Sequence, residues 1–413
     1  MFGERKIRDL RRSSINEAQL NAAATRSSLV AQAERKLGLG SPLSAGEGTR
    51  FYAHVMEAAG RPEPVNNPLG RITRIGQRHF IREQRRLSSQ MRMASSQSTD
   101  GTCRVLALDG GGAKGFYTLG VLRELEALLA HPMHESFDLI FGTSTGAIIA
   151  ALLALGNSVS DVHALYSKHV PTIMRRWTKG GRSSALERVA DEVFGEQKFD
   201  AFKTGIGIVA TRWDLERPMI FKASVEQAHG RKSTFEPGFG CTIAQAVRAS
   251  CSAYPFFRRP MLTLGTGDQV EVLDGGYCAN NPTLYAIADA VMALKHPLSA
   301  LRVVSIGVGH YPDPGRWTAR LVRMIPILPE LLQKTLDINT TSMEQLRSIL
   351  FRDIKAVRIN DRFDRPEMAT DLMEHNLTKL NELHKQGRES FAKHEAELRQ
   401  LLSISPVAPG SDS

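Results

Sequence analysis

The spacing of hydrophobic positions in this chain changes near residue 104, and the change marks where a folded core is predicted to begin. Beyond that point, short apolar runs typical of buried strands alternate with segments whose leucines recur at helical spacing. The predicted strands are Val105–Leu108, Phe137–Phe141, Ile206–Ala210 and Leu301–Val308, and the predicted helices are Phe116–Leu129 and the very apolar Ala147–Leu155. This alternation favours an α/β fold in which helices cover both faces of a mostly parallel sheet.

The segments on either side of this core have different patterns. Residues 1–100 show only weak helical periodicity, with Ile72–Leu87 as a candidate basic helix, and we expect an extension that is partly helical or disordered. Residues 104–310 form the predicted α/β domain. Residues 311–413 are predicted to be mainly helical and packed on that domain, because Met368–Leu402 reads as a polar amphipathic helix.

Composition adds three constraints. The 413 residues are 42% hydrophobic and 23% charged, as in an ordinary soluble enzyme. The net charge of +10 comes mostly from residues 1–100, which hold 17 Lys and Arg against 9 Asp and Glu. Such a segment can meet anionic lipid, nucleic acid or an acidic partner, or remain a solvated tail, and the sequence leaves these alternatives open.

Cysteine usage and apolar run lengths bear on location. The four cysteines are far apart and form no CxxC pair, which fits a reducing compartment and neither a disulfide framework nor a zinc site. The longest strongly apolar run, Ala147–Leu155, is much shorter than the roughly 20 residues that cross a bilayer. We therefore expect a cytoplasmic protein that contacts a membrane only peripherally.

The strongest chemical signal is the segment Gly142-Thr143-Ser144-Thr145-Gly146, which lies between a predicted strand and a predicted helix. A nucleophile elbow requires this setting, because small residues must flank a serine held on so sharp a turn. The serine then projects at a helix N-terminus, where backbone N–H groups and the helix dipole favour developing negative charge. Ser144 is the candidate nucleophile.

A second glycine-rich turn follows the first predicted strand, at Asp109–Gly115. Consecutive glycines let backbone N–H groups converge on an anion, as in an oxyanion hole or a phosphate site. A dinucleotide-binding turn would require an acidic residue at the end of the second strand, where Ser144 and its neighbours stand instead, and the spacing does not fit a P-loop. We assign an oxyanion hole to Gly110, Gly111, Gly112, Ala113, Lys114 and Gly115.

The third signal is Asp274-Gly275-Gly276, followed closely by Asn280-Asn281-Pro282. A serine nucleophile needs a base, and none of the twelve histidines lies in a recognisable triad context. An aspartate within hydrogen-bond reach can serve as that base. The metal-binding motif HExxH is absent as well, since the residue four after His134 is Asp138.

Taken together and in this order, the three motifs resemble those of the patatin-like phospholipases. That family pairs a DGGGx[R/K]G loop with GxSxG and a later DG[G/A]. Ala249–Phe257 is similar to the family's ASxAxPxxF block, and Asn280-Asn281-Pro282 matches the segment after its aspartate. The resemblance covers about residues 104–310 and implies a three-layer α/β/α fold with a mostly parallel central sheet.

The resemblance also implies a mechanism. Asp274 would accept the Ser144 proton as the hydroxyl attacks an ester carbonyl, and the N–H groups of Gly111 and Gly112 would hold the oxyanion. Lys114 would support the loop or meet a lipid phosphate. Water would then release the acyl group without a metal or other cofactor.

Within the family, the sequence of segment Leu106–Gly120 is similar to that found in a bacterial subset. The members of this subset are phospholipases that cyclic dinucleotides activate in anti-phage defence. The resemblance implies a cyclic dinucleotide activator from a partner synthase, membrane phospholipids at the inner face of the membrane as substrate, and no DNA or RNA partner. Two alternatives remain open: a hydrolase of other lipid esters or thioesters without nucleotide gating, and a catalytically silent lipid-binding protein.

Overall fold

The computed structural model describes residues 101–230, 232–312 and 327–404. The expectations for residues 1–100, including the basic helix Ile72–Leu87, lie outside these residues. The strands are β1 Cys103–Leu108, β2 Leu139–Thr143, β3 Gly205–Arg212, β4 Arg217–Lys222, β5 Met261–Thr263, β6 Gln269–Asp274, β7 Leu301–Ile306 and β8 Lys355–Ile359. The principal helices are α4 Gly115–Leu129, α5 Met133–Ser136, α6 Thr145–Leu155, α7 Val159–Met174, α8 Lys179–Phe194, α9 Ile243–Ser250, α10 Gly276–Ala279, α11 Thr283–Ala288, α13 Ile327–Leu350 and α14 Leu377–Leu402.

The strands form one sheet in the order β5-β6-β3-β2-β1-β7-β8, with β4 paired to β3. The strands β3, β2, β1, β7 and β8 are parallel, whereas β4, β5 and β6 join by antiparallel pairing. The predicted mostly parallel sheet is therefore confirmed, and it carries an antiparallel extension at one side that the sequence pattern did not indicate.

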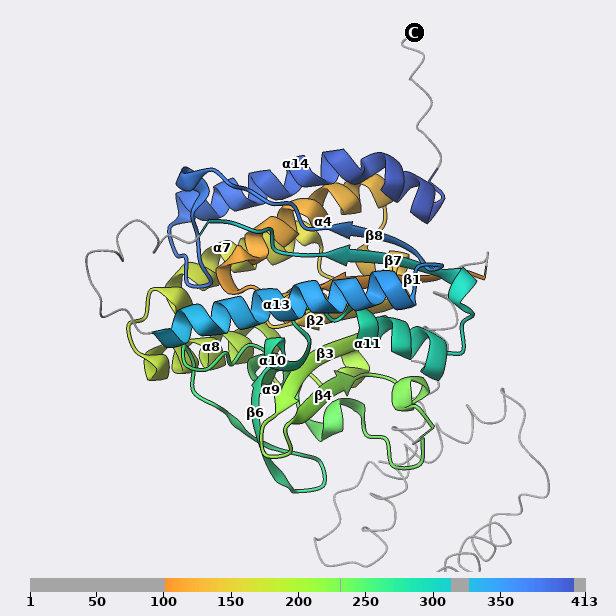
Figure 1. The fold of residues 1–413 in the computed structure, drawn as a ribbon. Helices are drawn as coiled ribbons and strands as arrows, with labels where there is room; N and C mark the ends of the chain where they lie inside the picture. The colour runs from red at the N-terminus through yellow and green to blue at the C-terminus, as the bar shows by residue number, and fades with distance from the viewer. Residues whose placement is uncertain (1–100, 231, 313–326, 405–413) are drawn as a thin grey trace, which may run out of the picture. The chain divides into compact units, whose positions relative to one another are not determined.

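Side chains that alternate along β1 explain the two helical layers, because successive residues of a strand point to opposite faces. Leu106 and Leu108 pack in the larger core with α4, α6, α7, α8, α9 and α14. Cys103 and Val105 pack in the smaller core with α11. Figure 1 shows α4 and α14 side by side on one side of the sheet and α13 with α11 on the other. The three-layer α/β/α expectation is confirmed.

Contact between α4 and α14 is unusually close at two glycines. A Cβ on Gly120 would lie 2.0 Å from the carbonyl oxygen of His384, and one on Gly387 would lie 2.1 Å from that of Tyr117. Only residues without a side chain allow the two helix backbones to approach this far. The C-terminal helix is thereby fixed against the first helix of the core.

Two expectations for residues 311–413 need correction. The last helix begins at Leu377 and not at Met368, because the side chain of Asn376 accepts a hydrogen bond from the N–H of Thr378 and caps the helix there. This part of the chain also supplies β8, which pairs with β7 and extends the sheet beyond residue 310. Its sequence, Lys-Ala-Val-Arg-Ile, is short and interrupted by charge, and the apolar pattern therefore did not indicate a strand.

The helices that the structure describes include none that is both long and apolar enough to cross a membrane.

Candidate active site

Strand β3 positions the two candidate catalytic side chains, because β2 and β6 meet end to end along one of its edges. Strand β4 occupies the other edge throughout, from Gly207 to Arg212. On the shared edge, Thr143 at the end of β2 pairs with Val209, and Asp274 at the end of β6 pairs with the next residue, Ala210. The two strands run towards each other, so the residues at their C-terminal ends become neighbours.

Ser144 lies at the turn between β2 and α6, with φ 52° and ψ −122°. A residue other than glycine rarely adopts a positive φ, and such strain is found where the surroundings enforce it. The surroundings are tight: a Cβ on Gly142 would lie 2.2 Å from the carbonyl oxygen of Gly146, and one on Gly146 would lie 2.3 Å from that of Leu108. The predicted elbow is present, and glycine is required at both flanking positions.

Ser250, at the end of α9, holds the elbow from the other side. Its hydroxyl accepts a hydrogen bond from the N–H of Ser144 at 2.9 Å and donates one to the carbonyl of Val209 at 2.6 Å. The backbone at Ser144 is thus tied to β3 through a side chain. In the sequence, Ser250 was noted only as part of the Ala249–Phe257 block, and no role was predicted for it.

The hydroxyl of Ser144 donates a hydrogen bond of 2.6 Å to Oδ2 of Asp274. The other carboxylate oxygen, Oδ1, accepts the N–H of Gly276 at 2.7 Å. Asp274 is 1% exposed, and this burial raises its pKa to about 7, although the hydrogen bonds from Ser144 and Gly276 oppose the shift. A carboxyl with such a pKa can accept and return a proton near neutral pH.

The glycine loop lies beside Ser144 with two of its N–H groups directed elsewhere. The N–H of Gly110 donates to the carbonyl of Asn280, and that of Ala113 donates to the carbonyl of Leu372, each at 3.0 Å. Within the described part of the chain, no hydrogen bond engages the N–H of Gly111 or Gly112, and both residues line the cavity at Ser144. These two are the predicted oxyanion donors.

The remaining members of the predicted loop are structural in their placement. Ala113 and Gly115 are buried, and a Cβ on Gly115 would lie 2.6 Å from the hydroxyl oxygen of Thr145. Lys114 is also buried, which lowers its pKa, and its side chain does not line the cavity. Of the two roles expected for Lys114, this placement fits support of the loop.

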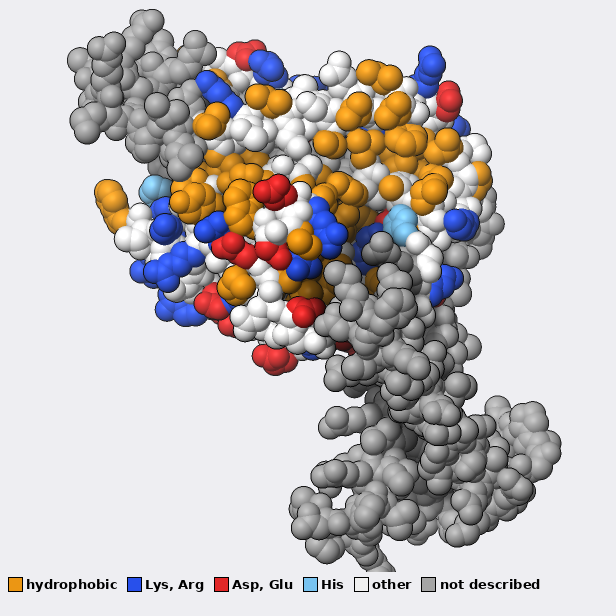
Figure 2. Space-filling view, turned by 60° about the horizontal axis from the view of Figure 1, so that its bottom comes forward, with side chains coloured by type: hydrophobic (Ala, Val, Ile, Leu, Met, Phe, Trp, Pro, Cys, Tyr) orange, Lys and Arg blue, Asp and Glu red, His pale blue; other side chains and the backbone are white. Residues whose placement is uncertain are grey.

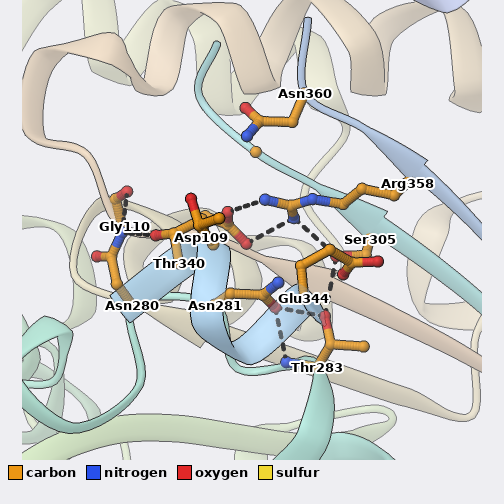
Figure 3. Close-up of polar contacts among 12 residues, drawn as sticks. Asp109, Gly110, Asn280, Asn281, Thr283, Ser305, Thr340, Glu344, Arg358 and Asn360 are labelled. Carbon is orange, nitrogen blue, oxygen red and sulfur yellow. Dashed lines mark hydrogen bonds and ion pairs between the residues drawn. The ribbon is translucent and has the colours of Figure 1, made fainter. Parts of the chain in front are cut away.

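An ion pair behind the loop anchors Asp109, the residue that begins the glycine motif (Figure 3). Arg358 reaches from β8, donates through Nη1 to Oδ1 of Asp109 at 2.9 Å and contacts Oδ2 through Nη2. The same Nη1 donates to the hydroxyl of Ser305 at 2.7 Å. Burial by itself lowers the pKa of Arg358, but the Asp109 carboxylate raises it overall, so the guanidinium stays charged.

Asn280 links the two glycine segments and α13. Its side-chain nitrogen donates to the carbonyl of Gly110 at 3.2 Å and to the hydroxyl of Thr340 at 2.7 Å (Figure 3). Its backbone N–H donates to the side chain of Asn339 at 2.8 Å. Neither Asn280 nor Arg358 was predicted as a site residue. The Asn-Asn-Pro segment was a visible signal for the first, whereas the sequence offered no signal for the second.

The cavity at Ser144 is mostly apolar. Its polar lining includes Ser144, Asp274 and Asn280 beside the glycine loop, and most of the other lining residues are aliphatic or aromatic, among them Ile148, Val170, Ile173, Leu186 and Phe256. A second, apolar cavity between α6, α7, α8 and α9 shares four of these residues, Ile148, Val170, Ile173 and Leu186. The described side chains lining the first cavity include no histidine, and no group of three metal-ligating side chains occurs among the described residues.

The remaining predicted site residues pack close by. The hydroxyl of Thr143 donates to the carbonyl of Ala279 at 2.7 Å, and that of Thr145 lies 3.0 Å from the hydroxyl of Tyr166. A Cβ on Gly275 would lie 2.1 Å from the carbonyl oxygen of Val209, and one on Gly276 would lie 2.6 Å from the side chain of Leu336. The structure therefore brings all three predicted motifs together.

Comparison with known proteins places these motifs in a family context. Residues 106–287 match the family model described as patatin-like phospholipase. The chain is 59% identical over 310 residues to the cUMP-AMP-activated phospholipase of Escherichia coli. This match covers 75% of this chain and 97% of that protein. It is 30% identical to a cGAMP-activated phospholipase of Pseudomonas aeruginosa, over 50% of this chain and 62% of that protein. Among solved structures, VipD from Legionella pneumophila matches with a TM-score of 0.40 and 14% identity, over 73% of this chain and 67% of that chain.

Proposed function

Since this chain belongs to the patatin-like phospholipase family, we propose that it hydrolyses acyl ester bonds of membrane phospholipids, with Ser144 as nucleophile and Asp274 as general base. The observation that carries the proposal is the 2.6 Å hydrogen bond from Ser144 Oγ to Asp274 Oδ2. It lies in a cavity that Gly111 and Gly112 also line, and within the described residues no hydrogen bond engages the N–H groups of these two glycines. Nucleophile, base and oxyanion donors are the groups that acyl transfer requires.

The reaction follows from these positions. Ser144 gives its proton to Asp274 as Oγ attacks the ester carbonyl, and the N–H groups of Gly111 and Gly112 stabilise the oxyanion. The leaving alcohol takes the proton from Asp274 as its bond to the acyl carbon breaks. A water molecule then gives a proton to Asp274 and attacks the acyl group, and the fatty acid leaves as Ser144 regains its proton. In a comparable site, one oxyanion donor is worth about 3–4 kcal/mol of transition-state stabilisation.

The cavity walls support a substrate with long apolar chains. Ile148, Val170, Ile173 and Leu186 line both the cavity at Ser144 and the apolar cavity between α6, α7, α8 and α9. An acyl chain whose carbonyl lies at Ser144 would be in contact with this apolar wall, and burying it there is favoured by about 0.8 kcal/mol per methylene group. A small polar ester would gain little from such walls.

For regulation we propose activation by a cyclic dinucleotide, with no metal or other cofactor in the reaction. The support is the similarity over nearly the whole length of the E. coli protein, which is a cUMP-AMP-activated phospholipase. In this proposal a partner synthase makes the nucleotide, and the enzyme then degrades phospholipids at the inner face of the membrane as part of anti-phage defence.

The test is fatty-acid release from phosphatidylglycerol and phosphatidylethanolamine vesicles by the wild type, Ser144→Ala and Asp274→Ala. Each protein is assayed with and without cUMP-AMP, and with cGAMP as a second nucleotide. We expect release by the wild type with cUMP-AMP and none by either variant. Activity without any nucleotide would remove the gating, and activity only on other esters or thioesters would change the substrate. Activity that survives Ser144→Ala would overturn the assignment of the nucleophile.

A further inference from the structure

A cluster of basic and aromatic side chains flanks the mouth of the cavity, and we refer to it as the α7–α8 rim. It consists of Arg175, Arg176, Trp177 and Lys179, at the connection between α7 and α8, and of Tyr254 and Arg258 from the loop after α9. All six residues are exposed. In the space-filling view, basic side chains gather on one flank of the molecule beside a projecting apolar side chain (Figure 2, left).

Four of these residues carry positive charge that the protein does not neutralise. Within the described residues, no ion pair involves Arg175, Arg176, Lys179 or Arg258. The neighbouring Arg259, in contrast, pairs with Glu271 at 3.0 Å and is not counted in the rim. An unneutralised patch of this kind attracts anionic surfaces, with about 1 kcal/mol per basic residue near an anionic lipid leaflet.

Trp177 is the most exposed large hydrophobic residue of the described chain, with 96% of its surface accessible. Water-exposed tryptophan is unfavourable, whereas the indole ring is favoured at the boundary between lipid headgroups and acyl chains. Tyr254 lies close by, with the ammonium group of Lys179 5.5 Å from its ring centre. The rim therefore combines amphipathic aromatic rings with cations, which is the composition of a membrane-surface contact.

The rim adjoins the active-site cavity, although none of its six side chains lines that cavity. Arg182 in α8 donates to the carbonyl of Phe256 at 2.9 Å and to the carbonyl of Arg176, and so ties the two halves of the rim together. Phe256 itself lines the cavity at Ser144, as does Met174, the residue before Arg175. A bilayer held by the rim would thus lie at the cavity mouth.

From these observations we infer that the α7–α8 rim docks the protein on an anionic phospholipid bilayer, with Trp177 inserted among the headgroups and the arginines and Lys179 against lipid phosphates. The inference rests on the proposed function for its substrate. It adds the surface through which the enzyme meets that substrate, and it predicts that anionic lipid governs access to Ser144.

Vesicle binding in the Ser144→Ala background tests this without hydrolysis. Partition onto vesicles of 30% phosphatidylglycerol in phosphatidylcholine is compared with partition onto pure phosphatidylcholine, with and without cUMP-AMP. Arg175→Gln/Arg176→Gln should weaken binding to the anionic vesicles by roughly 30-fold, from about 1 kcal/mol per charge. Trp177→Ala should weaken it by roughly tenfold, since an inserted indole buries apolar surface.

Matched controls lie at the opposite end of the parallel strands. Arg352 and Lys355 are exposed and precede or begin β8, whereas Ser144 follows the C-terminal end of β2. Arg352→Gln/Lys355→Gln removes the same charge, and Leu350→Ala removes a side chain that is 65% exposed. Neither should change partition by more than about twofold. Equal losses in rim and control variants would overturn the docking surface and leave only a general charge effect.

Two further measurements separate this inference from the proposed function. In a Trp213→Phe/Trp317→Phe protein, the fluorescence of Trp177 should shift to shorter wavelength with anionic vesicles and not with phosphatidylcholine alone. Rim variants with Ser144 intact should keep the wild-type hydrolysis rate on a soluble ester such as 4-nitrophenyl butyrate. On vesicles, the same variants should lose hydrolytic activity. If no ester is hydrolysed at all, the proposed function fails. If vesicle activity of the rim variants equals that of the wild type, the docking inference fails alone.

Discussion

Two aspartates that begin Asp-Gly-Gly segments lie at the ends of buried strands in this protein, and their surroundings differ in one respect. Asp109 follows β1 and Asp274 ends β6, and each is 1% exposed. Burial raises the pKa of both carboxyls, but only at Asp109 does an arginine, Arg358, oppose the effect. Asp274 has a hydroxyl and a backbone N–H as its partners instead.

The difference teaches how one motif serves two purposes. A carboxylate that accepts charge-assisted hydrogen bonds from both ends of a largely buried guanidinium is fixed in place, and it can anchor a loop. A buried carboxylate that lacks a cation has a pKa near neutrality and can take a proton from a neighbouring hydroxyl. The same Asp-Gly-Gly sequence therefore begins with a structural anchor at Asp109 and with a general base at Asp274.

The largest expected effect comes from changing the base alone. Asp274→Asn keeps the shape of the side chain but removes its ability to accept a proton, so fatty-acid release should fall by roughly 10⁴-fold. Stability should not fall. Because the folded pKa of Asp274 is raised from 3.8 to about 7, the wild type loses stability progressively as pH rises from 3.8 to about 7, and the variant does not.

Urea unfolding of the wild type and Asp274→Asn at pH 5 and pH 8 measures this. The variant's advantage should be larger at pH 8 than at pH 5. A variant that is inactive and also markedly less stable at pH 8 would show that Asp274 is an anchor like Asp109.

The opposite behaviour is expected from Arg358→Met, which removes the cation from the anchored aspartate. An uncompensated buried carboxylate should cost about 3–5 kcal/mol of unfolding free energy, and the misplaced loop should reduce activity as a consequence. The double variant Asp109→Asn/Arg358→Met should recover part of the lost stability, since no charge is then buried. If urea unfolding shows Arg358→Met to be as stable as the wild type, the anchor role of the pair is wrong.

The pH dependence of catalysis follows from the Asp274 pKa of about 7. The base must be ionised, so kcat/KM on a soluble ester should be constant above pH 8 and fall about tenfold per unit as pH decreases below 7. The same profile in Asp109→Asn/Arg358→Met, in which neither charge of the pair is left buried alone, would locate the titration at Asp274. A profile that stays flat down to pH 5 would mean that Asp274 titrates near its ordinary value and that burial does not govern it.

The sequence allowed the elbow and the glycine loop to be predicted because their constraints are local. Gly142 packs against the backbone of Gly146, four residues away, and no side chain fits between them. Arg358 is 249 residues from Asp109, and an arginine in a short, charged segment looks exposed until β8 pairs with β7 and buries it. Ser250 and the α7–α8 rim were missed for the same reason, since their roles depend on which distant segments the fold places together.

Asn280 connects the two regions and provides the finest test of the comparison. It follows the Asp274 segment and donates to the carbonyl of Gly110 in the loop that Asp109 anchors, while Thr340 of α13 accepts its other hydrogen.

Asn280→Ala should leave the Asp274 titration in place, but it frees the loop that carries the N–H groups of Gly111 and Gly112. We expect a loss of roughly tenfold in kcat with little change in KM, because the oxyanion forms only in the transition state. Asn280→Asp would place a carboxylate against the Gly110 carbonyl and should lose more. If Asn280→Ala instead moved the pH profile, the two regions would share one titrating network, and the distinction between anchor and base would not hold.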